Sequence, residues 1–333
     1  MTGLSTRGLI AGHGRRALLG PLDLTLPGGR FVCLIGANGA GKSTLIRTLC
    51  GMQAALSGEV LLDGARLSAL TANERARRLA VVLTERTAVP LMTGRELAAL
   101  GRYPHLGWGG RLGKEDREEV EQALQRVGAH DLAGRLVTEM SDGERQKIMI
   151  ARALAQQPSL LVLDEATAYL DLPRRVATMH LLRQLAREQG LSVLLSTHDL
   201  ELALRYADAL WLIDGQRRLH AGAPEDLALG GALGDTFAAD GLAFDLERAE
   251  LRVGHEGQRH IRLEGEGLHR VWAQRALQRM GYTPHRDARQ TVSADARGYC
   301  LTQADGAHQR FTTLEALTDV LAFQASTRGE STA

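Results

Sequence analysis

The stretch Gly36-Ala-Asn-Gly-Ala-Gly-Lys-Ser43 matches the pattern G-x-x-x-x-G-K-[ST] at every fixed position. It follows the apolar run Phe31–Ile35 and precedes a segment whose apolar residues recur with helical spacing. This order predicts a strand, a loop and a helix. The glycines let backbone N–H groups turn toward a phosphate chain at the positive end of the helix. The stretch therefore predicts a nucleotide phosphate site.

Two side chains of this loop carry the expected chemistry. The ammonium of Lys42 can reach the terminal phosphates, and the hydroxyl of Ser43 can hold Mg²⁺. Only three of the 40 basic residues in the chain are lysines, and a compact ammonium suits this position better than a planar guanidinium. The residues that we expect to bind the nucleotide here are Gly36, Asn38, Gly39, Gly41, Lys42, Ser43 and Thr44.

Length and composition set the outer limits. At 333 residues with 44% hydrophobic residues, the chain can form one large domain and a smaller one. The formal net charge of +1 gives no broad basic field, which argues against general nucleic-acid binding. The three cysteines form no C-x-x-C pair, so we expect neither a zinc site nor a disulfide framework. We expect the protein to work in a reducing compartment. No apolar run approaches the roughly 18 residues of a membrane span, so another chain would have to cross any membrane involved.

Beyond the loop, apolar strands alternate with helical patterns, which is typical of a mostly parallel sheet covered on both faces. The runs Leu160–Leu163 and Leu191–Leu195 are continuously apolar, as expected of strands buried on both sides. The first run ends in Asp164-Glu165 and the second leads to Ser196-Thr-His198. Polar side chains at such strand ends face the ligand crevice of an α/β sheet.

Two segments depart from this alternation. Residues 1–30 contain short apolar segments separated by Gly and Pro, which predict a small antiparallel sheet. Residues of about 86–157 predict a helical insertion, including a helix from Asp131 onward and a strong helix over 145–157.

Five motifs in series resemble the ATP-binding subunits of ABC transporters, and the resemblance covers about residues 1–225. They are the phosphate loop (Walker A), the Walker B run Leu160–Glu165, the signature-like Ser141-Asp142-Gly143-Glu144, the D-loop-like Ala168–Asp171 and the switch histidine His198. The resemblance implies an α/β fold, that of a P-loop NTPase (ABC ATPase), over residues 1–229. This fold has an antiparallel N-terminal sheet and a helical subdomain.

The resemblance also implies the role of each catalytic group. Asp164 would bind Mg²⁺ together with Ser43. Glu165 would polarise the attacking water, and a positioned general base of this kind contributes ~10² to 10⁴-fold. His198 would contact the γ-phosphate, although a lone histidine after a buried strand can also be a satisfied core residue.

The signature implies a partner. Ser141 and Glu144 fit an ordinary S-x-x-E capping box, and the same helix N-terminus is an anion site. In the family, Ser141, Asp142, Gly143 and Glu144 would complete the phosphate cage of the opposite subunit. The working unit would then be a homodimer with two ATPs at the interface and Asp171 near the seam.

Three positions depart from the family pattern. Asp142 stands where the signature usually has Gly, and a carboxylate there would repel a phosphate unless it points away. Glu85 stands where a Mg²⁺-sensing glutamine is expected; it could still offer an oxygen to Mg²⁺, or the alignment of this loop could differ. His13 falls where an aromatic residue stacks on adenine, and an imidazole stacks with less area than tyrosine.

The segment Gly101–Trp108 resembles the importer ATPases that serve iron-siderophore, haem and cobalamin permeases. This resemblance implies a peripheral protein at the cytoplasmic face of the inner membrane. It would bind integral-membrane permease subunits and cooperate indirectly with a solute-binding protein, without nucleic acid. Tyr103 and Trp108 would either face the permease or pack within the helical subdomain.

After the linker candidate Gly230–Gly234 the pattern changes. Residues 235–333 predict a small α+β domain with three strands and two helices: Arg259–Glu264, Gln290–Ala294, Tyr299–Gln303, His269–Met280 and Leu314–Phe323. Its histidines make no compact ligand set. A regulatory ligand domain and a dimer-stabilising appendage are both open interpretations.

Two rival functions stay open on sequence alone. A soluble ABC ATPase could act on nucleic acid or the ribosome, although the chain lacks a long coiled-coil insertion and has one ATPase cassette. An ATP-binding scaffold with little hydrolysis is the second rival, motivated by Asp142 and Glu85.

Overall fold

The computed structural model describes residues 3–83, 91–107, 109–168, 170–238, 242–246, 249–253 and 259–329. Contacts divide the chain into two compact units, Met1–Arg252 and Val253–Ala333. The predicted linker Gly230–Gly234 lies between two helices of the first unit, α8 (Pro224–Leu229) and α9 (Ala232–Ala238). Leu233 of α9 is fully buried in the core of that unit. The division between the units therefore falls later in the chain than the predicted linker.

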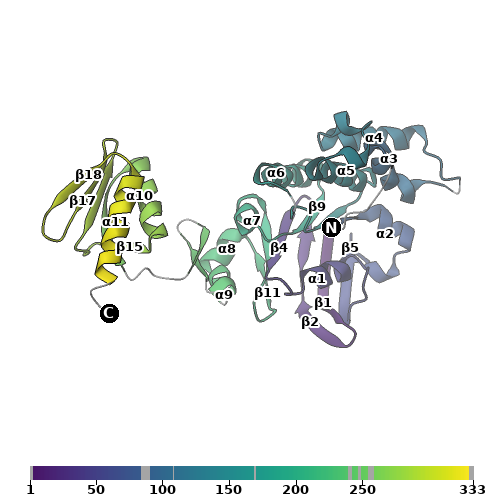
Figure 1. Ribbon diagram of the computed structural model, residues 1–333. Coiled ribbons are helices and arrows are strands. Elements are labelled where there is room, and N and C mark those ends of the chain that lie inside the picture. The colour runs from purple at the N-terminus through teal and green to yellow at the C-terminus, as the bar shows by residue number, and fades with distance from the viewer. Residues whose placement is uncertain are drawn as a thin grey trace. The chain divides into compact units, whose positions relative to one another are not determined.

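A six-stranded sheet with the order β11-β10-β4-β9-β8-β7 forms the centre of the first unit (Figure 1). Its strands are β4 (Phe31–Gly36), β7 (Leu79–Val82), β8 (Leu160–Asp164), β9 (Ser192–Ser196), β10 (Ala209–Ile213) and β11 (Leu219–Gly222). All neighbouring pairs are parallel except β10 with β11. Because β9 lies between β4 and β8, the carboxyl ends of these three strands meet at one edge, as predicted from the motifs they carry.

Alternate residues of each strand enter different cores. Val32 and Leu34 of β4 belong to one buried cluster, whereas Phe31, Cys33 and Ile35 belong to the other. This period of two explains why the strands read as continuous apolar runs, since both of their faces are buried.

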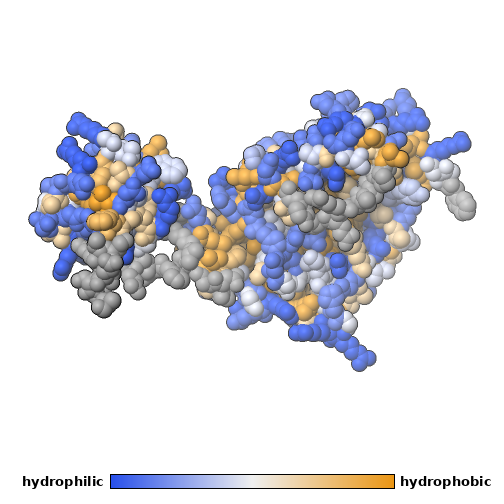
Figure 2. Space-filling model, viewed as in Figure 1, coloured by the Kyte–Doolittle hydropathy of each residue, from blue (hydrophilic) through white to orange (hydrophobic). Residues whose placement is uncertain are grey.

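One face of the sheet is covered by α1 (Lys42–Leu49) and by the N-terminal strands, and the other by helices (Figure 1). The predicted antiparallel entry sheet is present. It consists of β1 (Gly3–His13), β2 (Arg16–Leu22), β3 (Thr25–Pro27), β5 (Ser57–Leu62) and β6 (Ala65–Arg66). Hydrophilic side chains cover much of the face of the first unit that Figure 2 shows, while the apolar side chains gather in two buried clusters.

The helices of the first unit agree in part with the prediction. They are η1 (Leu67–Ala69), α2 (Ala72–Arg78), α3 (Gly94–Ala99), η2 (Leu100–His105), α4 (Lys114–Arg126), α5 (Asp142–Ala155), α6 (Leu172–Gln189) and α7 (Leu200–Tyr206). The helix expected from Asp131 onward was wrong, because only the short 3₁₀ turns η3 (His130–Leu132) and η4 (Val137–Glu139) form there. Within the described ranges, every helix is too short or too polar to traverse a bilayer.

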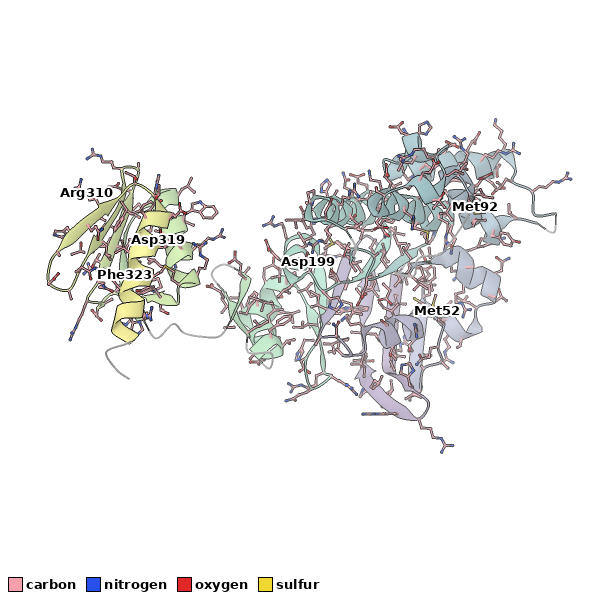
Figure 3. The ribbon with its side chains drawn as sticks, viewed as in Figure 1. Met52, Met92, Asp199, Arg310, Asp319 and Phe323 are labelled. Carbon is pink, nitrogen blue, oxygen red and sulfur yellow. The ribbon has the colours of Figure 1, made fainter. Side chains whose placement is uncertain are left out.

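The first unit ends with a two-stranded sheet, β12 (Leu242–Asp245) and β13 (Glu250–Val253). The second unit is a five-stranded sheet of order β15-β14-β16-β17-β18 with two helices, so the predicted small α+β fold is confirmed. Its elements are β14 (Arg259–Gly265), α10 (Gly267–Arg279), β15 (Tyr282–Pro284), β16 (Thr291–Asp295), β17 (Gly298–Thr302), β18 (His308–Phe311) and α11 (Leu314–Gly329). Leu277 of α10 and Leu317 of α11 share its core with Ile261 and Val292 of the sheet. Figure 3 shows Arg310 on the sheet and Asp319 and Phe323 on α11.

Candidate active site

The phosphate loop connects β4 to α1, as its sequence predicts. Gly39 has φ of 77° and Gly41 has φ of 109°, and both values lie in the region that glycine adopts without strain. Gly41 is the N-cap of α1 and makes no side-chain cap, so the first N–H groups of the helix stay free for an acceptor. A Cβ on Gly41 would lie 3.1 Å from Cδ1 of Leu19, so the loop is also closely covered by β2. The loop can therefore present backbone N–H groups to phosphate oxygens.

Lys42 is held at the start of α1 with only 5% of its surface exposed. Its Nζ donates to the carbonyl oxygens of Gly36 at 2.8 Å and Ala37 at 3.2 Å. Burial lowers the pKa of Lys42, while the charges of Glu165 and Asp164 oppose this shift. An ammonium held by carbonyls in the loop can exchange them for phosphate oxygens, which carry more negative charge.

Ser196 ties the two acidic residues of β8 to the neighbouring strand. It is fully buried at the end of β9, and its Cα is paired with that of Asp164. Its Oγ donates to Oδ1 of Asp164 at 2.6 Å and accepts the backbone N–H of Glu165 at 2.9 Å. Sequence reasoning missed this role, although a serine directly after a buried strand beside the acidic pair was a usable signal.

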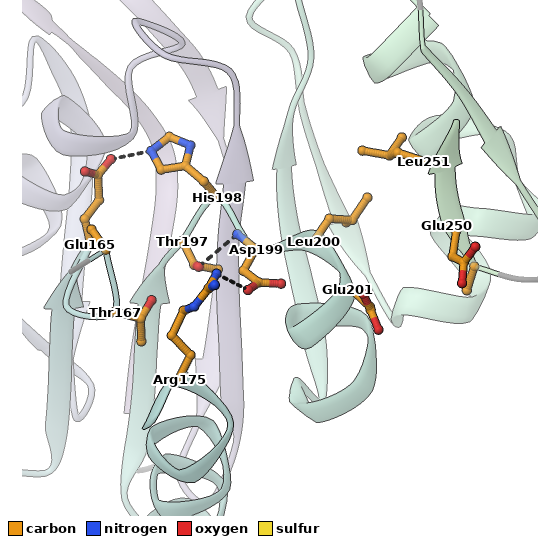
Figure 4. A pocket seen from close by; sticks show the side chains of 12 residues that line it. Glu165, Thr167, Arg175, Thr197, His198, Asp199, Leu200, Glu201, Glu250 and Leu251 are labelled. Atoms are coloured by element: carbon orange, nitrogen blue, oxygen red, sulfur yellow. Dashed lines mark hydrogen bonds and ion pairs between the residues drawn. The ribbon is translucent and has the colours of Figure 1, made fainter. Parts of the chain in front are cut away.

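Glu165 has φ of 50°, which is a left-handed backbone conformation that non-glycine residues seldom adopt. Its Oε1 lies 2.7 Å from Nε2 of His198, so the structure brings the two predicted catalytic residues together. Both side chains line a pocket of about 680 Å³ (Figure 4). Thr167 and Asp199 also line this pocket, together with Leu251 of β13. A carboxylate and an imidazole in contact at an open pocket can orient a water and move its proton.

Asp199 and Arg175, which both line the pocket, support this edge. Nη1 of Arg175 donates to Oδ2 of Asp199 at 2.8 Å, and Oδ1 of Asp199 accepts the backbone N–H of Leu202. The ion pair links the first turn of α6 to the N-cap of α7. It therefore fixes the loop that carries His198, and sequence reasoning did not identify it.

His13 lies at the end of β1, beside the phosphate loop. Its Nε2 is 2.9 Å from Oγ1 of Thr44 in α1, and its ring is exposed. The structure thus brings His13 to the site, as the sequence suggested.

The signature-like segment forms the start of α5, and its capping box is present. The N-cap Ser141 accepts the N–H of Glu144, and Oε2 of Glu144 accepts the N–H of Ser141 at 2.8 Å. Arg135 donates to the other carboxylate oxygen of Glu144 at 2.8 Å. These contacts with Ser141 and Arg135 lower the pKa of Glu144 to about 2. Asp142 is exposed in the first turn, whereas Gly143 is buried.

The D-loop residue Asp171 is the N-cap of α6. Its Oδ1 accepts the backbone N–H of Arg174 at 3.0 Å. Asp171 is also exposed, so it is available to another chain. Its neighbour Tyr169 lies outside the described residues.

The residues present fit a magnesium ion. The exposed hydroxyl of Ser43 and the carboxylate of Asp164 are hard oxygen donors, which Mg²⁺ prefers. The hydroxyl of Ser196 orients the carboxylate of Asp164. The predicted third donor, Glu85, lies outside the described residues.

Comparisons with known proteins agree with this geometry. The family described as ABC transporter matches residues 19–168, and the iron ABC transporter C-terminal domain matches residues 258–322. An uncharacterised ABC transporter ATP-binding protein of Methanocaldococcus jannaschii is 42% identical over 224 residues, covering 67% of this chain and 77% of that protein. The ferric enterobactin transport ATP-binding protein of Escherichia coli is 37% identical over 219 residues, covering 66% of this chain and 81% of that protein.

A solved structure of an ABC transporter assigned to the metal-chelate type, in an inward-facing conformation, has a TM-score of 0.63 and 25% identity. The match covers 72% of this chain and 90% of that chain.

The parallel sheet, the phosphate loop and the acidic edge define the first unit as a P-loop ATPase domain. Together with the matched family and its relatives, they assign the protein more closely. The chain belongs to the ATP-binding subunits of ABC transporters. The predicted family, fold class and ATPase activity are therefore confirmed.

Proposed function

We propose that two copies of this chain enclose two MgATP molecules and power a membrane permease that imports an iron-siderophore, haem or cobalamin-type metal chelate. The main support for a metal chelate as cargo is the match of residues 258–322 to the iron ABC transporter C-terminal domain. The relative from Escherichia coli, which serves ferric enterobactin transport, supports the same choice.

In each subunit the phosphate loop holds the nucleotide. Backbone N–H groups at Gly39 and Gly41 surround the phosphates, and Lys42 leaves the carbonyl oxygens of Gly36 and Ala37 to bind the terminal phosphates. The hydroxyl of Ser43 and the carboxylate of Asp164 would hold Mg²⁺, which would neutralise negative charge on the phosphates. His13 covers the nucleotide from the side of the N-terminal sheet.

Glu165 accepts the proton of the attacking water. The 2.7 Å contact with His198 supports this role, because the imidazole fixes the orientation of the carboxylate before water arrives. When ATP is bound, the ring of His198 would contact the γ-phosphate. Ser196 orients the carboxylate of Asp164 and the backbone of Glu165, because its hydroxyl donates to the former and accepts the N–H of the latter.

The signature serves the partner subunit. The N-terminus of α5 and the hydroxyl of Ser141 complete the phosphate cage of the partner's ATP. Asp171 lies at the seam between the subunits. The exposure of Asp142 supports this arrangement, because an exposed carboxylate can point away from the phosphates.

The helical subdomain meets the permease. Leu91 and Tyr103 expose apolar surface on this part of the chain, and Tyr103 is 74% exposed rather than packed inside. Arg102 beside it is buried, with Nε donating to Asp116 at 2.9 Å and Nη1 donating to the carbonyl of Ala155 at 2.8 Å. A fixed backbone with an exposed aromatic ring suits a docking surface. The chain would then lie at the cytoplasmic face of the inner membrane as a peripheral subunit.

Affinity purification of the tagged chain from membranes tests the permease assignment. We expect a multi-spanning partner to be recovered together with the chain, and Tyr103→Ala to reduce its recovery without reducing ATPase activity of the isolated chain.

Uptake of radiolabelled iron-siderophore tests the cargo. It is measured in cells that lack the gene, with Glu165→Gln as the inactive control. Recovery of ribosomes or nucleic acid in place of a permease would count in favour of the soluble rival.

A further inference from the structure

The side chain of Arg174 lies directly over Gly143. A Cβ placed on Gly143 would lie 2.6 Å from Cδ of Arg174, 3.1 Å from its Nη1 and 3.2 Å from its Nε. At a separation under 3 Å one of the two groups must shift, so a side chain at position 143 would move the arginine from the place that it occupies beside glycine. Gly143 has an ordinary helical backbone, so no left-handed conformation demands glycine there.

Arg174 is held in this place by the D-loop. Its backbone N–H donates to Oδ1 of Asp171 at 3.0 Å, and its Nε lies 3.7 Å from Oδ2 of the same carboxylate. The arginine belongs to the first turn of α6, whereas Gly143 belongs to the first turn of α5. One side chain therefore joins the D-loop to the signature helix.

The charges around the first turn of α5 give this contact a second consequence. The turn contains two carboxylates, Asp142 and Glu144, and Glu144 is paired with Arg135 at 2.8 Å. The guanidinium of Arg174 lies against the residue that follows Asp142. It brings a positive charge to this turn. The turn carries the carboxylate of Asp142 at the position where the signature of the family usually has glycine.

We propose that Arg174 is a positioning residue of the signature. It holds the first turn of α5 in register with the D-loop and offsets the charge of Asp142 where the partner's phosphates lie. This inference rests on the proposed ATP-bound dimer. On this proposal, glycine occupies position 143 because Arg174 needs the space. The approach of a phosphate to the backbone can require glycine there as well.

The two explanations of Gly143 predict different results in a double-mutant cycle. If Gly143 serves Arg174, then Gly143→Ala disturbs the site by displacing the arginine, and it adds little once Arg174→Ala is present. If Gly143 serves only the approach of a phosphate, the two substitutions act independently and their effects add.

The experiment uses the full chain with Glu165→Gln, so that ATP is bound but turned over slowly. Sedimentation velocity then gives the ATP concentration at which half of the chain is dimeric. We expect Arg174→Ala to raise this concentration about tenfold, since the positive charge beside the first turn of α5 is removed. Gly143→Ala should raise it similarly, and the double variant should match Arg174→Ala alone. Arg126→Ala, which removes an exposed arginine bonded to Gln122, is the matched control and should leave it unchanged.

A second cycle keeps the test independent of whether Gly143→Ala folds well. In a chain that carries Asp142→Gly, the effect of Arg174→Ala should shrink, because the carboxylate to be offset is absent. Arg174→Lys should recover part of the loss caused by Arg174→Ala, which a defect of folding alone would not predict.

Three outcomes overturn the inference. An Arg174→Ala variant that dimerises like Arg126→Ala removes the positioning role and leaves the proposed dimer intact. Additive effects of Arg174→Ala and Gly143→Ala return Gly143 to a role in phosphate approach alone. Failure of the Glu165→Gln chain itself to dimerise with ATP refutes the proposed dimer, and the role of Arg174 is refuted with it.

Discussion

Nε2 of His198 lies 2.7 Å from Oε1 of Glu165, although the two residues follow different strands and are separated by the whole of α6. The contact exists because β8 and β9 are parallel neighbours in register, with Leu163 opposite Leu195 and Asp164 opposite Ser196. Parallel pairing brings both strand ends to one edge, so the loops after these strands must meet. The catalytic pair is thus a consequence of sheet order.

The first prediction concerns the proton acceptor. Glu165→Gln keeps the size and the hydrogen-bonding ability of the side chain but removes its basicity. We expect ATP binding to persist and turnover to fall by ~10² to 10⁴-fold, the usual contribution of a positioned base. Binding of a fluorescent ATP analogue and steady-state phosphate release measure the two effects separately. Glu188→Gln on the exposed end of α6 is the control, and a normal rate in Glu165→Gln would remove Glu165 from the mechanism.

A second prediction separates His198 from Glu165. His198→Ala leaves the base present but removes the group that orients it, so we expect kcat to fall by about 10²-fold with little change in KM. His180→Ala removes an exposed histidine from α6 and serves as the control. If KM alone rises in His198→Ala, the histidine binds the nucleotide in the ground state and does not orient the carboxylate.

The third prediction concerns the buried hydroxyl of Ser196. Ser196→Ala leaves the N–H of Glu165 and one oxygen of Asp164 without this partner, which costs about 1 to 3 kcal/mol in unfolding free energy. ATPase activity should fall as well, because the carboxylate of Asp164 and the backbone of Glu165 lose their common partner. Urea unfolding followed by circular dichroism measures the stability.

Ser192 offers a matched control on the same strand. It is also fully buried, and in the part of the chain that the structure describes its Oγ has no hydrogen-bond partner. Ser192→Ala should therefore leave the stability unchanged or raise it. Equal losses in Ser192→Ala and Ser196→Ala would mean that packing, and not the hydrogen bonds, explains the role of Ser196.

The sequence predicted the parts of the site that are contiguous in the chain. The phosphate loop and the pair Asp164-Glu165 come directly after strands whose apolar runs are readable, and their place at the carboxyl edge results from parallel pairing. The function of Ser196 was not predictable, because it depends on the register of β8 with β9. The contact of Arg174 with Gly143 depends on how the first turns of α5 and α6 meet in space, and no periodicity encodes that.

The division of the chain was also harder to predict than its elements. Gly230–Gly234 has the composition of a linker, yet the chain continues into α9, where Leu233 packs into the large core. A glycine-rich stretch indicates a turn, whereas a domain boundary depends on the contacts that the next elements of the chain make. The predicted helix after Asp131 does not form either. Gly134 lies between the two short 3₁₀ turns found there, and glycine disfavours a continuous helix.

A fourth prediction tests the burial of the thiols. Burial raises the pKa of Cys50 to about 12 and that of Cys33 still further, so both stay as unreactive thiols at neutral pH. Cys300 on β17 is partly exposed. We expect iodoacetamide at pH 8 to modify only Cys300 in the folded chain and all three cysteines in urea, as measured by mass spectrometry of peptides. Labelling of folded Cys300→Ser would show that the core around β4 or α1 opens more readily than its packing implies.

The last prediction concerns acid and the signature helix. The pKa of Glu144 is lowered from 4.5 to about 2 by its hydrogen bonds with Ser141 and Arg135. Because the folded chain binds this proton less readily than the unfolded chain, the ionised carboxylate stabilises the fold fully above pH 4.5. That contribution is lost as the pH falls from 4.5 toward 2.

Glu144→Gln can keep the capping box while removing the charge. The melting temperature of the native chain should therefore exceed that of Glu144→Gln at pH 7, and the difference should shrink across this window. Glu188→Gln should show no such convergence, and a difference that is constant with pH would mean that the charge of Glu144 does not stabilise the start of α5.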